Sequence, residues 1–309
     1  MMKQWTLALL AALTLVLTAC GAPAAENTTQ GSYATITDDN GRTVTFDKKP
    51  ERIVVTSASF IAPLYAVGGE IVGRPVTKSK VLPEAESAAT IGPVYQIDAE
   101  KIIALTPDLV ILNKGMNEKL IETLAANNIQ TLVIDMKSYE DVKREVATFA
   151  ALTGEKAKGD ELIQKMDADI EAVRSSIPQE KKRISIIHST GQGLSVQLDG
   201  SIAGSIAKML GWENTASGMP ALDKNPDAAP YSMETLVAQN PDIIFVTSMG
   251  EEAEIRASME AMFAESPAWQ SVSAIRDGRV YYLPQEMFLF SPGIDYPKAV
   301  GYMARLIYP

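Results

Sequence analysis

Histidine and cysteine, which supply most metal ligands and many catalytic groups, occur once each among these 309 residues, as His188 and Cys20. A zinc centre or a free zinc or manganese receptor needs several such ligands. A serine hydrolase needs a base beside its nucleophile, but Ser59 and Ser189 lie outside any Gly-x-Ser-x-Gly turn, and one histidine leaves one possible base. We therefore expect neither an enzyme nor a protein with a cofactor or metal centre of its own.

Aromatic and thioether side chains are more numerous, and they gather in segments that follow expected strands. Flat rings and polarisable sulfur atoms suit the face of a large planar ligand, such as a porphyrin or corrin ring. Each of these residues taken alone is more often a core residue, so we expect about half of them to line a shared cleft. The candidate ligand-binding residues are Ser59, Phe60, Tyr95, Met116, His188, Tyr231, Met249, Met287 and Phe288.

His188 allows two interpretations. It stands at the carboxyl end of an expected strand at residues 184–187, from which a metal ligand can face a cleft. We favour a partly buried histidine with a structural role, and metal ligation is the alternative. Three cations that follow an early strand, Arg74, Lys78 and Lys80, either bind carboxylates of a ligand or belong to a solvated loop.

The elements that must position these side chains alternate along the first half of the chain. Two alternating runs at residues 33–37 and 42–46 flank Asp38-Asp39-Asn40-Gly41, which predicts a hairpin. Further on, the sequence predicts strands at residues 52–56, 70–73, 109–112 and 131–135, and a helix at residues 61–67. Strands that alternate with helices predict a parallel sheet covered by helices.

A long helical region without a strand, at residues 139–177, divides the chain. Gly154 interrupts it and Pro178 closes it, and apolar residues in its second half recur at three- and four-residue steps, so one face packs. The strand at 184–187 then restarts the alternation. One interpretation is a single α/β domain with a helix across its face, and the other is two Rossmann-like α/β lobes joined by one long bridging helix.

The N-terminal residues indicate export. Lys3 precedes an apolar run at residues 7–17, which is too short for a transmembrane helix and is typical of a signal peptide. The run ends in Leu17-Thr18-Ala19-Cys20, which resembles the bacterial lipobox, whose cysteine is acylated and becomes the first residue of the mature chain. Residues 1–19 contain one lysine and no acid, so the formal net charge of −10 becomes −11 in the mature chain. An acidic surface argues against nucleic acid as a partner.

An internal repeat favours two lobes. Residues 99–112 and 233–246 share one pattern, in which Glu100 or Glu234 opens a short amphipathic helix, Pro-Asp begins seven residues later and four apolar strand residues follow. Equivalent units on either side of a long helix predict two similar lobes. The predicted domains are a signal peptide at residues 1–19, a flexible tether at 20–32, an N-terminal lobe at 33–153, a bridging helix at 154–178 and a C-terminal lobe at 179–309.

In the order of its segments the mature chain resembles the substrate-binding proteins of ABC importers for iron chelates, heme and cobalamin, the class III periplasmic binding proteins. The segments that carry the resemblance lie at residues 52–55, 68–73, 100–112, 139–177, 234–246 and 278–281. The resemblance implies two lobes on one stiff helix, a cleft that closes little, and a lipid anchor at Cys20 on the outer face of the cytoplasmic membrane. It also implies that one glutamate on each lobe, here Glu100 and Glu234, docks on an ABC permease dimer served by a cytoplasmic ATPase. We expect the protein to be a monomer.

Within that family the likeness is greatest to heme-receptor lipoproteins of Gram-positive bacteria, through residues 72–83 and 91–102. Where that group places its axial heme ligands, typically methionine and histidine, this sequence reads Tyr95 and Met249. Both side chains can bind heme iron. The resemblance therefore implies heme or another tetrapyrrole or metal chelate as cargo, and it leaves a ferric siderophore or a corrinoid such as cobalamin as alternatives.

Overall fold

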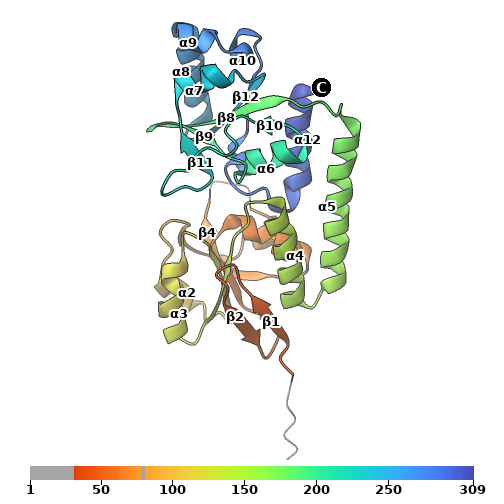
Figure 1. Ribbon diagram of the computed structural model, residues 1–309. Coiled ribbons are helices and arrows are strands. Elements are labelled where there is room, and N and C mark those ends of the chain that lie inside the picture. The colour runs from red at the N-terminus through yellow and green to blue at the C-terminus, as the bar shows by residue number, and fades with distance from the viewer. Residues whose placement is uncertain (1–30, 78–80) are drawn as a thin grey trace, which may run out of the picture. The chain divides into compact units, whose positions relative to one another are not determined.

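The structure is a computed structural model that describes residues 31–77 and 81–309 (Figure 1). The predicted signal peptide, Cys20, most of the predicted tether, Lys78 and Lys80 lie outside the described residues. Within the described residues, no helix is long and apolar enough to cross a membrane.

The N-terminal hairpin is confirmed. Strands β1 (Ala34–Thr37) and β2 (Thr43–Phe46) pair antiparallel as a sheet of their own. The Asp38 carboxylate accepts the backbone N–H groups of Asn40 and Arg42, at 3.1 and 2.9 Å. Gly41 adopts φ 74°, which a residue without a side chain tolerates best. The Asp-Asp-Asn-Gly signal therefore forms the turn that its composition predicts.

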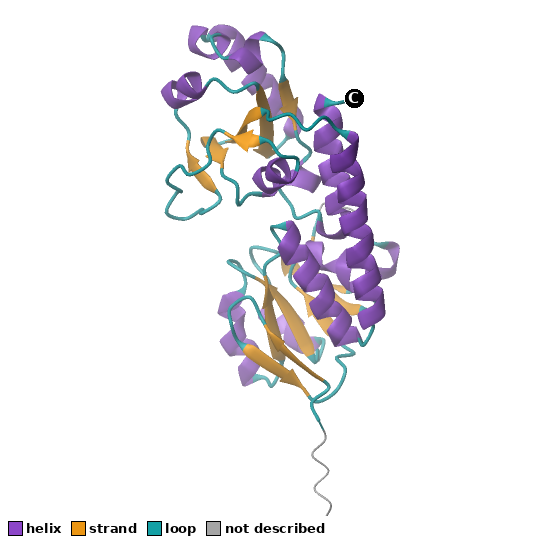
Figure 2. Ribbon diagram, turned by 45° about the vertical axis from the view of Figure 1, so that its right-hand side comes forward, coloured by secondary structure: helices purple, strands orange, loops and turns teal. Residues whose placement is uncertain are grey.

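The N-terminal lobe contains a parallel sheet of five strands in the order β5-β4-β3-β6-β7. Its strands are β3 (Ile53–Val55), β4 (Ile71–Val76), β5 (Ala89–Pro93), β6 (Leu109–Asn113) and β7 (Gln130–Ile134). Its helices are η1 (Ala58–Phe60), α1 (Ile61–Ala66), η2 (Pro83–Ala85), α2 (Ala99–Ala104), η3 (Glu118–Leu120), α3 (Ile121–Ala126) and α4 (Tyr139–Thr153). Helices α2 and α3 lie on one side of this sheet and α4 on the other (Figures 1 and 2).

The two sides follow from alternation along the strands. Val54 and Val110 belong to the core cluster that contains α2 and α3, whereas Val55 and Ile111, one residue further on, belong to the cluster that contains α4. Both faces of a parallel sheet are thus buried, which explains why its strands read as unbroken β-branched runs rather than as apolar–polar alternation.

The C-terminal lobe contains a six-stranded sheet with the path β11-β9-β8-β12-β13, and β10 pairs with β8. Its strands are β8 (Arg183–Thr190), β9 (Gly193–Gln197), β10 (Glu213–Asn214), β11 (Ala228–Pro230), β12 (Ile243–Met249) and β13 (Val280–Tyr282). Its helices are α6 (Ile202–Met209), α7 (Met233–Gln239), α8 (Glu252–Glu265), α9 (Pro267–Gln270), α10 (Ser273–Arg276), α11 (Gln285–Phe288), η4 (Gly293–Asp295) and α12 (Tyr296–Ile307).

The second sheet is mixed, which departs from the prediction of two parallel sheets. Strand β9 runs antiparallel to β8 and to β11. Only Gly191 and Gln192 separate β8 from β9, and a connection of two residues is too short for the crossover that a parallel strand requires. The α/β fold with two lobes is otherwise as predicted.

The internal repeat occupies equivalent places in the two sheets. Helix α2 connects the edge strand β5 to β6, and α7 connects the edge strand β11 to β12. The aspartate of each Pro-Asp pair accepts the backbone N–H of an arginine at the start of the neighbouring strand, Asp108 from Arg52, just before β3, at 2.9 Å and Asp242 from Arg183, the first residue of β8, at 3.1 Å. Each arginine also donates to a backbone carbonyl at the C-terminal end of α2 or of α7, at 2.7 Å in both lobes. The repeat therefore builds the same strand–helix joint twice.

One helix contacts both lobes. Helix α5 (Lys156–Ser176) packs against α4 at one end and against α12 at the other (Figures 1 and 2). Gly154, at φ 75°, caps the end of α4, and Gly159 brings α5 so close to α4 that a Cβ there would lie 2.5 Å from the Ala150 Cβ. Met166 and Ile170 of α5 belong to an apolar cluster that extends from the N-terminal sheet into the C-terminal sheet. The lobes therefore share one continuous core.

A buried carboxyl group on α4 makes the stability of the fold depend on pH. Glu145 is 2 % exposed, and its Oε2 atom has no hydrogen-bond partner among the described residues. Burial and the nearby negative charge of Asp39 raise the pKa of Glu145 to about 9, against the weaker opposing effect of Arg144, whose Nε lies 3.5 Å from Oε1. Glu145 is therefore a neutral acid at neutral pH.

We predict that the free energy of unfolding falls as pH rises from 7 to 8, above the range in which the histidine titrates. Over this interval the folded chain binds the Glu145 proton and the unfolded chain, with a carboxyl pKa of about 4.3, does not, which removes up to about 1.4 kcal/mol per pH unit. Glu145→Gln should flatten this dependence and unfold at higher denaturant concentration than the wild type at pH 8. Identical pH dependence of the two proteins in denaturant titrations would contradict the assignment.

Candidate functional site

Exposed apolar side chains stand where strands of both sheets end. Tyr95 follows β5 and is 73 % exposed, Met116 follows β6 and is 51 % exposed, and Met249 ends β12 and is 56 % exposed. Ligands of open α/β sheets bind outside the carboxyl ends of the strands, and large apolar side chains exposed there are candidates for contact with a ligand. These three residues are the predicted site residues that the structure leaves accessible.

Met116 is held by its own loop. The Asn113 side chain lies 3.5 Å from the Met116 sulfur, toward which its amide points. The Asn113 carbonyl accepts the backbone N–H of Met116 at 3.2 Å, and the Glu118 carboxylate accepts that of Gly115 at 2.6 Å. The thioether is thus exposed, yet its loop is closed by short-range hydrogen bonds.

In the C-terminal lobe, the loop beside Met249 is also held by hydrogen bonds. Gly250 follows it at φ 137°, a conformation that L side chains rarely adopt. The Gln285 side chain donates to the Gly250 carbonyl at 2.7 Å, and the Gln285 backbone N–H donates to the Glu252 carboxylate at 2.9 Å. The loops that follow β12 and β13 are therefore joined next to the Met249 side chain.

His188 is a partly buried residue of β8. Its Nδ1 lies 3.0 Å from the Thr247 hydroxyl of the neighbouring strand β12. Burial lowers the pKa of His188 below its ordinary value, so the ring is neutral at neutral pH. A neutral ring bonded to a neighbouring strand agrees with the structural role that we favour from the sequence.

Phe60 and Phe288 are corrections to the predicted set, because both are fully buried core residues. Phe60 ends η1 and packs edge-on against Phe149 of α4, with ring centroids 6.4 Å apart. Phe288 ends α11 and contacts Tyr302 of α12, with centroids 6.1 Å apart. In each case a short helix begins three residues after the last residue of the strand, and its first turn carries the ring into the core.

Three further candidates are partly buried. Tyr231 stacks on Trp269 at 5.8 Å, and burial raises the pKa of its hydroxyl to about 12. Met287 lines a hollow of about 390 Å³ beside α5 and α12, together with Tyr302 and Arg305. Ser59 lies against Gly293 of η4. All three residues are less exposed than Tyr95, Met116 and Met249.

The two lobes also meet through charged side chains near the strand ends. Lys137, which follows β7, forms an ion pair with Asp227, which precedes β11, at 3.1 Å. The Asp227 partner and the neighbouring Asp135 raise the pKa of Lys137 against the opposing effect of burial, so this lysine stays charged. The sequence did not reveal this pair, since its members are 90 residues apart and no local pattern links them.

The two glutamates of the repeat occupy matching positions. Glu100 lies in the first turn of α2 and Glu234 in the first turn of α7, each two residues after its N-cap, Asp98 or Ser232. Both are exposed, and among the described residues neither carboxylate has a hydrogen-bond or ion-pair partner. An acid in a first turn is favoured by the helix dipole alone, but two unpaired acids at equivalent places remain available for an external partner.

Comparison with known proteins identifies the family. The model of the periplasmic binding protein family matches residues 53–287. The chain belongs to the periplasmic binding protein family. It is 26 % identical over 322 residues to an uncharacterized ABC transporter substrate-binding lipoprotein of Bacillus subtilis, YvrC, covering 99 % of this chain and 96 % of that protein. This periplasmic binding protein is thus a substrate-binding protein of the ABC-importer type, not an enzyme.

Two solved structures of Staphylococcus aureus share its fold. The heme complex of IsdE, a high-affinity heme uptake protein, has a TM-score of 0.72 and 20 % identity, covering 84 % of this chain and 99 % of that one. The staphyloferrin B complex of SirA has a TM-score of 0.73 and 19 % identity, covering 89 % and 98 %. The fold is therefore shared by proteins solved in complex with two different molecules, heme and staphyloferrin B.

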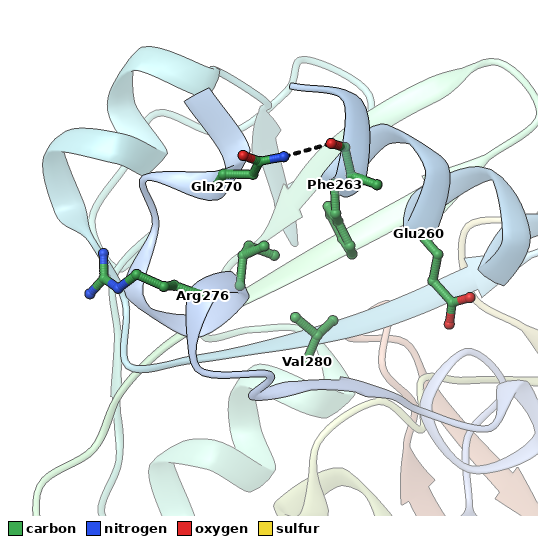
Figure 3. Close-up of a pocket in the computed structure, with 7 residues that line it drawn as sticks. Glu260, Phe263, Gln270, Arg276 and Val280 are labelled. Carbon is green, nitrogen blue, oxygen red and sulfur yellow. Dashed lines mark hydrogen bonds between the residues drawn. The ribbon is translucent and has the colours of Figure 1, made fainter. Parts of the chain in front are cut away.

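A hollow of about 530 Å³ lies elsewhere on this periplasmic binding protein (Figure 3). Helices α8, α9 and α10 and strand β13 surround it, and its lining includes Phe263, Arg276 and Val280. Val280 is the first residue of β13, so the hollow lies at the amino end of that strand. It is separate from the strand ends that hold Met249.

We predict that the single histidine titrates below its ordinary midpoint of about 6.5, because burial disfavours the charged ring. The free energy of unfolding should decrease as pH falls below that value, because the unfolded chain binds the proton more readily than the folded chain. One ring signal in a ¹H–¹³C NMR titration measures the midpoint without assignment. A midpoint at or above 6.5 would contradict a buried, neutral His188.

Proposed function

We propose that this protein captures heme, or a related iron–tetrapyrrole complex, outside the cytoplasmic membrane and delivers it to the permease of an ABC importer. The observation that carries the proposal is the exposure of a phenol and two thioethers, Tyr95, Met116 and Met249, beyond the strand ends of both sheets. Such side chains offer apolar contact to a planar ring, and Tyr and Met are both known ligands of heme iron. Heme is bound by IsdE, which has this fold.

The charges near the strand ends support a cargo with little negative charge. In the described part of the loops that follow the strands, Lys114 donates to the Asp39 carbonyl at 2.9 Å and Lys137 is paired with Asp227. Lys224 is exposed. Arg74 donates to backbone carbonyls, at 3.2 Å to Ala85. An anionic siderophore would require several unpaired cations that converge. A siderophore, such as the staphyloferrin B bound by SirA, is therefore the second candidate. Cobalamin is the third.

In this proposal Tyr95 and Met249 are the axial ligands of the iron, one from each lobe. Lipidation of Cys20 anchors the mature chain to the outer face of the cytoplasmic membrane, and the protein acts as a monomer. Glu100 and Glu234 dock on the two halves of the permease dimer, whose cytoplasmic ATPase drives import. Two unpaired carboxylates on a rigid body give an electrostatic register for docking, which improves orientation more than affinity.

We predict that the mature protein titrated with hemin gives a saturable shift of the Soret band. Tyr95→Phe removes only the phenol oxygen, and Met249→Leu removes the sulfur but keeps an apolar side chain, so each should change the spectrum and raise the Kd about tenfold, equivalent to about 1.4 kcal/mol. Tyr33→Phe is the control: it removes a hydroxyl that donates to the Leu152 carbonyl at 3.1 Å, at the start of the hairpin, and should leave both unchanged.

Spectra of the Tyr95 and Met249 variants identical to that of the wild type would refute the axial assignment. Parallel titrations with cobalamin and with ferric siderophores decide the cargo, and saturable binding of one of these but not of hemin would overturn heme.

We predict that Glu100→Ala combined with Glu234→Ala abolishes uptake of cargo by cells and leaves the Kd for cargo unchanged, because these carboxylates contact the permease only. The matched control is Glu122→Ala with Glu254→Ala, which removes one exposed first-turn acid from α3 and one from α8. Both pairs remove the same charge from the same two lobes. Equal uptake by the two double variants, or weakened cargo binding by the first, would count against docking.

A further inference from the structure

The turn that presents Tyr95 has a fixed backbone. The Gln96 N–H donates to the Pro93 carbonyl at 2.8 Å, and the Asp98 N–H donates to the Ile91 carbonyl at 2.8 Å. Gly92 adopts φ 103°, and a Cβ at that position would lie 2.6 Å from the Gln96 carbonyl oxygen. The exposed ring of Tyr95 is therefore carried by a tight turn. Hydrogen bonds within the turn fix its shape, and contacts with neighbouring loops fix its position in the lobe.

A buried amide from the neighbouring loop holds this turn. Asn117 is 1 % exposed, and its Nδ2 donates to the carbonyl of Val94 at 2.9 Å. Val94 is the residue before Tyr95. Asn117 directly follows Met116, and its backbone N–H donates to the Asn113 carbonyl at 3.0 Å. One side chain thus joins the loop that carries Tyr95 to the loop that carries Met116.

The Asn117 side chain does little for the stability of its own segment. It precedes η3, yet it makes no capping hydrogen bond to that helix. Its Oδ1 is buried and has no hydrogen-bond partner among the described residues. A buried acceptor without a partner is unfavourable, so an apolar residue of similar size would suit this place better if packing were the only requirement.

We infer that Asn117 is a positioning residue, which fixes the Tyr95 ring relative to Met116 and so sets the shape that the N-terminal lobe presents to cargo. The C-terminal lobe has a counterpart, since Gln285 joins the loops after β12 and β13 through the Gly250 carbonyl, next to Met249. Each lobe therefore uses one side-chain amide to fix a cargo-facing residue. This inference rests on the proposed function for the contact with cargo. The hydrogen bond from Asn117 to the Val94 carbonyl, which we call the clamp, does not depend on which cargo binds.

The test is a double-mutant cycle of Asn117→Leu and Tyr95→Ala, read by the Kd for hemin. Leucine matches asparagine in size and removes the donor together with the unpaired acceptor, so the variant should fold. If Asn117 acts through Tyr95, Asn117→Leu raises the Kd about tenfold in the wild type and less than twofold when Tyr95 is already alanine. Equal effects in both backgrounds would overturn the inference.

Asn214→Leu is the matched control. Asn214 is another buried asparagine whose Nδ2 donates to a backbone carbonyl on a different strand, that of Gln197 at 3.0 Å, and it lies in β10 of the other lobe. It should lower the melting temperature and leave the Kd within twofold of the wild type. A loss of hemin affinity equal to that of Asn117→Leu would reduce Asn117 to a general structural role and refute the inference.

Hydrogen exchange separates failure of the inference from failure of the proposed function. Without any cargo, Asn117→Leu should speed exchange of the Gln96 amide at least tenfold, and unchanged exchange there would refute the clamp. If the wild type does not bind hemin, the heme proposal fails, and the cycle is repeated with whichever of cobalamin or a ferric siderophore saturates the wild type. Should none bind, the exchange result alone decides whether the clamp exists.

Discussion

The architecture depends on an apolar core that does not stop at the boundary between the lobes. Met166 and Ile170 of α5, Phe149 of α4 and Val300 of α12 belong to the same buried cluster as the inner faces of both sheets. Rotating one lobe against the other would expose part of this surface, at about 25 cal/mol for each Å² of apolar area. Tyr139 and Tyr296, whose ring centroids are 5.4 Å apart, lie at the same junction, and Tyr139 donates to Asp167 of α5 at 2.9 Å. A joint built in this way favours a fixed spacing between cargo-facing loops over a wide hinge motion.

A fixed joint gives the internal repeat its functional meaning. Because the lobes carry the same strand–helix unit, each presents an exposed thioether or phenol beyond its strands and an unpaired glutamate at the start of a helix. The arginine–aspartate joints at Arg52 and Asp108, and at Arg183 and Asp242, attach each unit to the next strand of its own sheet. Cargo recognition and permease docking then depend on the same rigid geometry, which is consistent with binding by preorganised surfaces rather than by closure.

Much of the fold followed from local sequence signals, and most of the site did not. The hairpin, the β-branched strands and the two Pro-Asp units are encoded by neighbouring residues, so they were predictable. Strand β9 was not anticipated, because only Leu194 and Val196 of its five residues are apolar and its direction depends on a two-residue turn. Phe60 and Phe288 follow strands just as Tyr95 does, but each ends a short helix, η1 or α11, that places its ring in the core. Asn117 and Lys137 act across loops that are distant in the sequence, which no periodicity records.

In the proposed complex, cargo binds beyond the strand ends, between Tyr95 of the N-terminal lobe and Met249 of the C-terminal lobe. A crystal of the mature protein soaked with hemin, with diffraction data collected at the iron absorption edge, would locate the bound iron. We predict one anomalous peak within bonding distance of the Tyr95 oxygen and the Met249 sulfur, with the two lobes oriented as they are without cargo. A peak elsewhere, for example in the hollow beside Phe263 and Arg276, would contradict it.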